Sequence, residues 1–81
     1  MVDPASVQSR QELVAFITGL GQDLMANEAA WENSTLERYL EALAGWTSDM
    51  DGWFSNRKEV EPDQPTWSLV AQMLLAASMY E

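Results

Sequence analysis

Hydrophobic residues recur every three or four positions in three stretches of the chain. This spacing places side chains on one face of an α-helix. It predicts helices over about 10–26, 35–51 and 66–80, with a connector over 52–65. The sustained alternation of apolar and polar residues that is typical of strands is missing from the sequence. We therefore expect an all-α fold, a small three-helix bundle.

Capping residues support these boundaries. The segment from Ser9 to Glu12 matches a capping box, in which a serine oxygen and a glutamate three residues later satisfy free backbone N–H groups. The segment from Ser34 to Glu37 repeats the pattern before the second helix. We expect the first helix to stop at Asn27 and the second at Gly52, because glycine readily adopts the left-handed conformation that ends a helix. Thr66 is the expected N-cap of the third helix.

A chain of 81 residues has room for one domain. We expect residues 9–81 to form a single helical domain, preceded by a flexible segment over 1–8. The connector over 52–65 is expected to be partly ordered, because the aromatic pair Trp53-Phe54 can pin its start to the core.

Four tryptophans are many for a chain of this size. Trp46 and Trp67 are expected in the core, at positions that continue the helical stripes. Trp31 can act as a hydrophobic staple before the second helix. Trp31 and Trp53 are also expected in the core, with an interface, where tryptophan is enriched, as the alternative.

The third predicted helix carries no charged residue from Thr66 to Tyr80. Its apolar side chains form two nearly opposite stripes: Trp67, Val70, Ala71, Leu74 and Ala77 in one, and Leu69, Met73, Ala76 and Tyr80 in the other. A helix that is apolar all round is normally buried all round, which two other helices can hardly achieve. The helix is therefore either a central core helix or one that packs on a second copy or another protein, with Met73 and Tyr80 as candidate contacts.

Charge narrows the range of partners. Four basic and thirteen acidic residues give a formal net charge of −9, and nine of the acids lie between Glu28 and Asp63. This charge repels nucleic acid phosphates and anionic membranes and favours a basic protein surface. Solubility alone is the alternative explanation. The candidate contacts in this region are Glu32, Glu37, Glu41, Asp49, Asp51 and Trp53.

The sequence gives little support to a catalytic site or a metal-binding site. The sequence has no cysteine and no histidine, which excludes disulfides, thiolate nucleophiles, the usual zinc ligand sets and a Ser-His triad. Asp49-Met50-Asp51-Gly52 departs from a calcium loop, because an EF-hand has its glycine at the sixth position. The two aspartates can cap a turn, contact a protein or bind a cation. Paired carboxylates such as Glu37 and Glu41 need a cleft that a protein of this size hardly provides. We expect no enzyme activity, no cofactor and no metal site.

Targeting signals are not evident. The N-terminal residues 1–4 carry no basic stretch followed by an apolar run. The longest uncharged stretch, 64–80, is at the lower limit for a membrane span and is interrupted by polar residues. We expect a soluble, cytoplasmic protein that makes no contact with a membrane.

Several spaced motifs resemble those of a family of small bacterial domains of unknown function. The resemblance rests on Trp31-Glu32-Asn33, on Trp46 followed by the run from Asp49 to Phe54 and Asn56, and on Pro65-Thr66-Trp67. It covers roughly residues 12–81. It implies a compact helical domain and brings no activity with it.

The sequence is compatible with two main hypotheses about function and a third, weaker one. The first is a small acidic, non-enzymatic protein-binding module, an inhibitor comparable to immunity proteins, antitoxins or anti-CRISPR proteins, that covers a basic surface on another protein. The second is a structural homodimer with the uncharged third helix as its seam. A weak enzyme or metal-binding domain using Asp49 and Asp51 is a third hypothesis.

Overall fold

The structure is a computed structural model that describes residues 2–60 and 64–80. Its elements are η1 (Pro4–Ser6), α1 (Arg10–Ala26), η2 (Glu28–Ala30), α2 (Leu36–Asn56) and α3 (Trp67–Met79), where η denotes a short 3-10 turn. No strand occurs in the described part of the chain. The prediction of an all-α, three-helix fold is confirmed.

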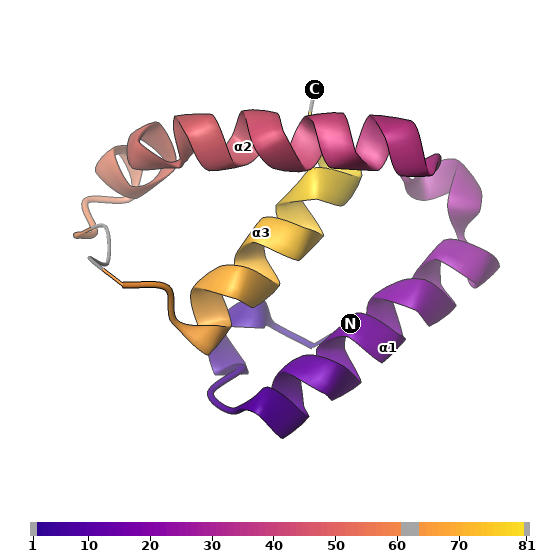
Figure 1. Cartoon of the computed structure of the whole chain (residues 1–81), viewed down its shortest axis with the longest axis horizontal. Coiled ribbons are helices and arrows are strands. Elements are labelled where there is room, and N and C mark those ends of the chain that lie inside the picture. The colour runs from indigo at the N-terminus through magenta and orange to yellow at the C-terminus, as the bar shows by residue number, and fades with distance from the viewer. Residues whose placement is uncertain (1, 61–63, 81) are drawn as a thin grey trace.

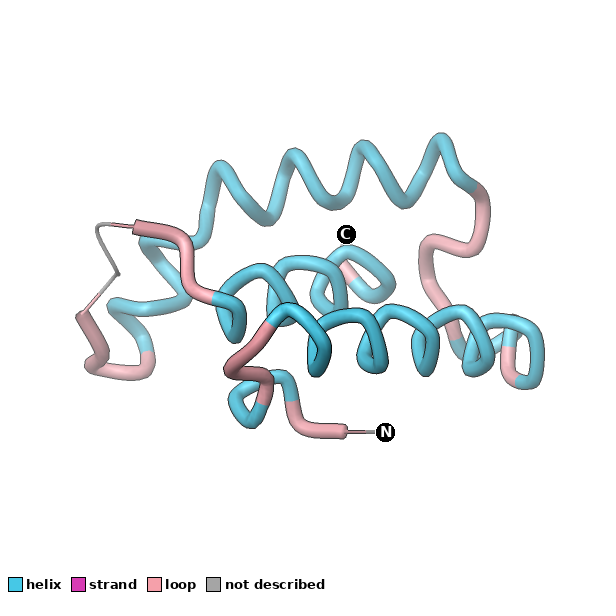
Figure 2. Tube along the Cα trace, turned by 60° about the horizontal axis from the view of Figure 1, so that its bottom comes forward, coloured by secondary structure: helices cyan, strands magenta, loops and turns pink. Residues whose placement is uncertain are grey.

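The helix α3 is the central element. The helices α1 and α2 diverge from the turn η2, and α3 crosses the space between them and packs on both (Figure 1). The turn η1 packs on α3 from the side turned away from the viewer of Figure 1, as the second view shows (Figure 2). The molecule is flat, with extents of 34 × 28 × 18 Å.

A small hydrophobic core joins η1, α1 and α3. Val7, Phe16, Leu20 and Ala71 are buried in it, with half-buried neighbours that include Leu75. Burying a side chain the size of valine or leucine contributes about 1.5–3 kcal/mol to stability. Residues 4–7, within the segment 1–8 that was expected to be flexible, pack against this core, because Val7 is only 2% exposed and closes the core beneath α3.

Three of the predicted helix ends are confirmed. The Ser9 hydroxyl accepts the Glu12 backbone N–H at 3.1 Å, and the Glu12 carboxylate accepts the Gln8 N–H at 3.1 Å. The helix α1 ends with Asn27 as its C-cap. The Thr66 hydroxyl accepts the Leu69 N–H at 3.0 Å and caps α3.

The second helix departs from the prediction at its N-terminus. Thr35, rather than Ser34, is the N-cap, and its hydroxyl accepts the Arg38 N–H at 3.3 Å. The third helical position is thus occupied by Arg38, so Glu37 is out of register for a capping box.

The C-terminus of α2 also differs, because the helix runs past Gly52 to Asn56. Gly52 does not have a positive φ, so it is an ordinary helical residue and not a C-cap. The helix continues because its last turns bury aromatic rings: Trp53 lies edge-on to Trp46 at 5.7 Å between ring centroids, and Phe54 is buried. The predicted connector 52–65 therefore begins five residues too early, and its positions 61–63 lie outside the described residues.

Exposure to solvent distinguishes Trp46 from Trp67, although both were expected in the core. Trp46 is buried, as predicted. Trp67 is 43% exposed, so its placement in the core is wrong. It lies at the first turn of α3, where it lines a hollow with Pro65, Thr66 and Val70.

Among residues 2–60 and 64–80, no helix combines the length and the hydrophobicity that crossing a membrane requires.

Candidate functional site

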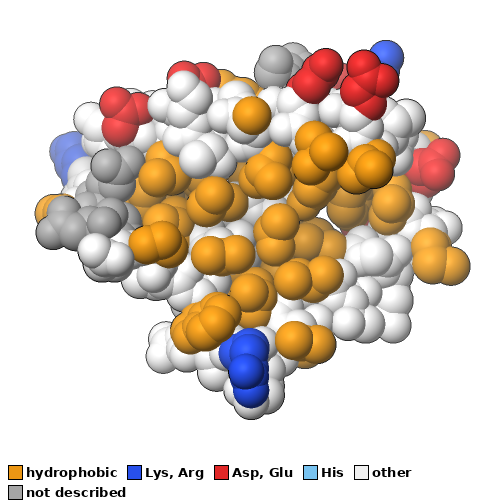
Figure 3. Space-filling model, viewed as in Figure 1, with side chains coloured by type: hydrophobic (Ala, Val, Ile, Leu, Met, Phe, Trp, Pro, Cys, Tyr) orange, Lys and Arg blue, Asp and Glu red, His pale blue; other side chains and the backbone are white. Residues whose placement is uncertain are grey.

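An acidic ridge follows α2 and the residues just before it. We use this name for five exposed carboxylates: Glu32, Glu37, Glu41, Asp49 and Asp51. Arg38 is the only basic residue between positions 27 and 56. Within the described residues the one ion pair joins Arg57 and Glu59, beyond the end of α2. The ridge therefore keeps its negative charge, and acidic side chains are visible along the upper edge of Figure 3, where α2 lies.

A polar hollow of about 500 Å³ lies beside this ridge. Its lining comes from the loop before α2, from α2 and from the end of α3: Glu32, Asn33, Arg38, Glu41, Ala42, Gly45 and Tyr80. The Tyr80 ring lies against Gly45, so close that a Cβ at this glycine would stand 3.1 Å from Tyr80 Cε2. The hollow brings together Glu32, Glu41 and Tyr80, three of the residues that the sequence predicts for the partner site.

Asp49 joins this group through a hydrogen bond. The Tyr80 hydroxyl donates to the Asp49 carboxylate. This hydrogen bond, with a smaller effect of burial, raises the pKa of Tyr80, because ionisation of the phenol would place two negative charges side by side. Asp49 and Tyr80, 31 residues apart, thus fix the end of α3 to α2.

Asn33 positions the hollow, and sequence reasoning missed this role. Its side-chain amide donates to the carbonyl oxygens of Ala77 at 3.0 Å and Tyr80 at 2.6 Å, and its backbone N–H donates to Ser78 O at 3.0 Å. These are the carbonyl groups that the end of a helix leaves without partners. The sequence suggests only a cap for α2 at Asn33, because all three partners are more than forty positions away.

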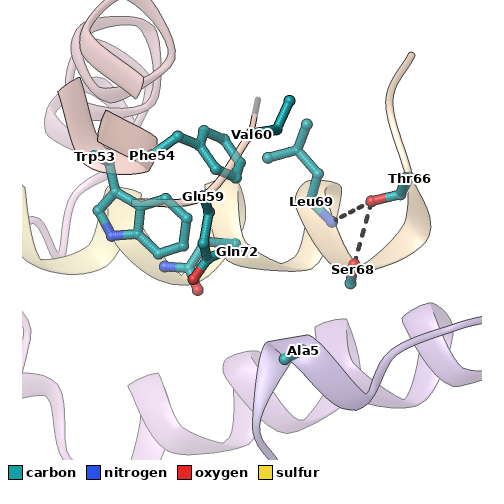
Figure 4. A pocket seen from close by; sticks show the side chains of 9 residues that line it. All are labelled: Ala5, Trp53, Phe54, Glu59, Val60, Thr66, Ser68, Leu69 and Gln72. Carbon is teal, nitrogen blue, oxygen red and sulfur yellow. Dashed lines mark hydrogen bonds between the residues drawn. The ribbon is translucent and has the colours of Figure 1, made fainter. Parts of the chain in front are cut away.

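The remaining predicted site residues lie elsewhere. Glu37 is exposed on α2 outside the hollow, and the Asp51 carboxylate accepts its neighbour's N–H at Gly52. Trp53 lines a different pocket, of about 290 Å³, where Phe54 and residues of α3 surround it (Figure 4). Met73 is half-buried on α3. The eight predicted residues therefore do not line a single pocket.

A second feature, the apolar face, lies between α1 and α2, on the side of α3 opposite to η1. Its main groove, of about 320 Å³, is lined by Ile17, Leu20, Gly21, Leu24, Trp31, Asn33, Ser34, Thr35, Leu36, Tyr39 and Leu74. A neighbouring hollow of about 530 Å³ is lined by Pro65, Thr66, Trp67 and Val70. No charged residue is in either lining. Figure 3 shows hydrophobic side chains gathered over this region.

Hydrogen bonds hold the walls of the groove. The Trp31 indole N–H donates to Asp23 at 2.8 Å, and this bond, with one from Asn27, lowers the pKa of Asp23. The Trp31 ring stacks on Tyr39 with 6.2 Å between centroids. The Tyr39 hydroxyl donates to Leu74 O at 2.6 Å, and burial raises the pKa of Tyr39. The groove is thus a built surface and not a gap between mobile side chains.

The predicted absence of a metal site leads us to ask whether potential ligands lie close together. Within the described residues, no three His, Cys, Asp or Glu side chains converge in a way that could hold a metal ion. Asp49 and Asp51 differ in their partners, since one accepts from Tyr80 and the other from Gly52.

Comparison with known proteins identifies the family of the chain but indicates no activity. Neither the curated proteins nor the solved structures include a significant match to the chain. A family model does match residues 9–81. This range contains all three helices, the acidic ridge and the apolar face, and it excludes only η1 among the elements. The chain therefore belongs to DUF7660, a family of unknown function.

Proposed function

We propose that this protein is a non-enzymatic protein-binding module whose acidic ridge docks on a basic surface of another protein. The observation that carries the proposal is the ridge itself, with five exposed carboxylates and Arg38 as the one basic side chain along it. Facing carboxylates and basic side chains accelerate association and select the partner. Where the basic surface is one that binds nucleic acid, the module acts as an inhibitor.

A binding role suits these carboxylates better than catalysis. General acid catalysis by a carboxyl group requires a desolvated environment that keeps it protonated near neutral pH. Glu37 and Glu41 are exposed, and the hollow beside them is open to solvent. The contact between Tyr80 and Asp49 gives this side a fixed shape, which a specific interface needs.

The proposal can be tested with a synthetic arginine-rich helical peptide as the probe. Its Kd for the full chain is measured by fluorescence anisotropy at low and high NaCl. We expect the double variant Glu37→Gln/Glu41→Gln to bind roughly fivefold more weakly, because each rim charge contributes about 0.2–1 kcal/mol. Affinity should also fall as salt increases.

The matched control is Asp3→Asn/Glu59→Gln, which removes the same charge from exposed positions outside the ridge. We expect its ln Kd to rise by less than about half as much as that of the ridge variant, since it keeps every ridge carboxylate. Equal losses in the two double variants would show that the peptide senses net charge only and would overturn the proposed site. Affinity that is indifferent to salt would overturn its electrostatic basis.

A further inference from the structure

Glu32 differs from the other four carboxylates of the acidic ridge in its position on the chain. Glu37, Glu41, Asp49 and Asp51 belong to α2, whereas Glu32 lies in the loop between η2 and α2. A loop residue ordinarily loses conformational freedom when it binds, which lowers the affinity that its contact contributes. Glu32 can therefore contribute fully only if the fold already holds its backbone in place.

The residue before Glu32 is fixed to α1 and α2. The Trp31 indole N–H donates to the Asp23 carboxylate on α1 at 2.8 Å, and the Trp31 ring stacks on Tyr39 of α2 with 6.2 Å between ring centroids. The Trp31 backbone N–H also donates to Glu28 O at 3.0 Å, in the turn η2. Trp31 therefore connects the loop to both helices.

The residue after Glu32 is fixed to the end of α3. The Asn33 backbone N–H donates to Ser78 O at 3.0 Å, and its side-chain amide donates to the carbonyl oxygens of Ala77 and Tyr80. Both neighbours of Glu32 are thus held by hydrogen bonds to other elements, while Glu32 itself is exposed. Its carboxylate also takes no part in the one ion pair that the described residues form, so it is available to a partner.

The polar hollow shows what this position adds to the ridge. Glu32 lines the hollow from the loop, and Glu41 lines it from α2. Carboxylates on one helix have the spacing of that helix, which is independent of the rest of the fold. A carboxylate held on a second element makes the required arrangement of basic side chains on the partner depend on the fold, and this favours specificity.

We propose that Glu32 is the specificity-determining residue of the acidic ridge, and that Trp31 and Asn33 are its positioning residues. The inference rests on the proposed function, because it concerns the partner of the same ridge. The partner that fits presents basic side chains to the loop and to α2 at the same time. Because its backbone is held before binding, Glu32 contributes as much to the affinity as a carboxylate on α2 does.

The probe is the same arginine-rich helical peptide, and its Kd for the full chain is measured by fluorescence anisotropy at low NaCl. Glu32→Gln should bind roughly threefold more weakly, within the range of a single exposed charge pair. In the Asn33→Ala background the same change should cost less than about 1.5-fold, because the loop no longer holds Glu32 in place. A general loss of stability in Asn33→Ala would not produce this selective effect.

The matched control is Glu37→Gln, which removes the same charge from an exposed residue of α2 outside the hollow. It should weaken binding by the same factor in the wild-type and Asn33→Ala backgrounds. Trp31→Phe is a second background, which keeps a ring beside Tyr39 and removes the indole N–H, and the cost of Glu32→Gln should fall there as well. Urea unfolding verifies that each background is folded.

Three results would overturn the inference and leave the proposed function standing. The first is a wild-type Kd in Glu32→Gln while the ridge variant Glu37→Gln/Glu41→Gln binds more weakly. The second is a cost of Glu32→Gln that is the same in all three backgrounds, and the third is an equal fall in the costs of Glu32→Gln and Glu37→Gln. Failure of the proposed function itself differs from these, because the ridge variant would then bind no more weakly than its control.

Discussion

At the scale of single residues, Asn33 connects two segments that lie far apart in the sequence. One carboxamide and one backbone N–H bind three carbonyl groups at the end of α3. An amide can donate twice from the same nitrogen, which a carboxylate or an alkyl group cannot do. Asn33 therefore determines where the chain before α2 meets the end of α3.

Asn33→Asp should destabilise the protein by about 2–3 kcal/mol at neutral pH. The change replaces a donor with a carboxylate that faces the Ala77 and Tyr80 carbonyl oxygens. Part of the loss should recover below about pH 4, where a protonated aspartate can donate one hydrogen bond. Urea unfolding followed by tryptophan fluorescence measures both effects. Asn33→Ala serves as the control, and a recovery at low pH in that variant as well would contradict the explanation.

Tyr80 makes stability depend on pH in the alkaline range. Its folded-state pKa lies above the ordinary value of 10.0 because its hydroxyl donates to Asp49. This contribution is complete below the pKa of the unfolded chain and is lost as pH rises through the folded pKa.

Tyr80→Phe should therefore differ from wild type by a constant amount below about pH 9, and the difference should shrink at higher pH. Urea midpoints of both proteins between neutral pH and about pH 11 test this, with Tyr39 titrating equally in the two. A difference that stays constant up to the highest pH would show that the phenol does not titrate against Asp49.

At the scale of elements, the helix ends show what local sequence can and cannot predict. Ser9, Asn27 and Thr66 were predictable because caps use partners within four residues. The end of α2 was not, because Gly52 has a local preference for ending a helix and the burial of Phe54 overrides it. Long-range packing, which a single sequence does not display, decides such cases.

Gly52→Ala should stabilise the protein by about 0.5–1 kcal/mol, because alanine is the better helix former and a Cβ at this position meets nothing within 4 Å. Equilibrium urea unfolding gives the change. Gly45→Ala in the same helix is the matched control, since its Cβ meets the Tyr80 ring and the gain should be smaller or reversed. If Gly52→Ala destabilises the protein instead, then α2 ends at Gly52.

At the scale of the whole molecule, charge and hydrophobicity occupy different surfaces. The sequence indicated that acids gather before Asp63 and that 66–80 is uncharged, and it suggested an interacting surface on each. It did not indicate that Trp67, Val70 and Leu74 line hollows on the open side of α3 while Tyr80 contacts Asp49 on α2. Helical periodicity gives the stripes, but the crossing of α3 between α1 and α2 determines which residues of a stripe stay exposed: Ala71 is fully buried, whereas Trp67 of the same stripe is 43% exposed.

The net charge predicts a salt effect on folding. Raising NaCl from about 0.01 M to about 1 M shortens the Debye length from about 30 Å to about 3 Å and weakens repulsion within the chain. We expect the urea midpoint to rise, by less in Glu37→Gln/Glu41→Gln, which has lost two of the repelling charges. The measurement uses a concentration at which sedimentation shows monomer. A midpoint that falls with moderate salt would mean that attraction dominates among the charges.

The central position of α3 has a consequence for synthesis. The helices α1 and α2 are translated before α3, the helix that packs on both of them and on η1. Until residues 67–79 leave the ribosome, Phe16 and Leu20 lack Ala71, with which they form the buried core. The core that joins α1 and α3 therefore forms only after the third helix has emerged, and until then its apolar side chains are without their packing partners.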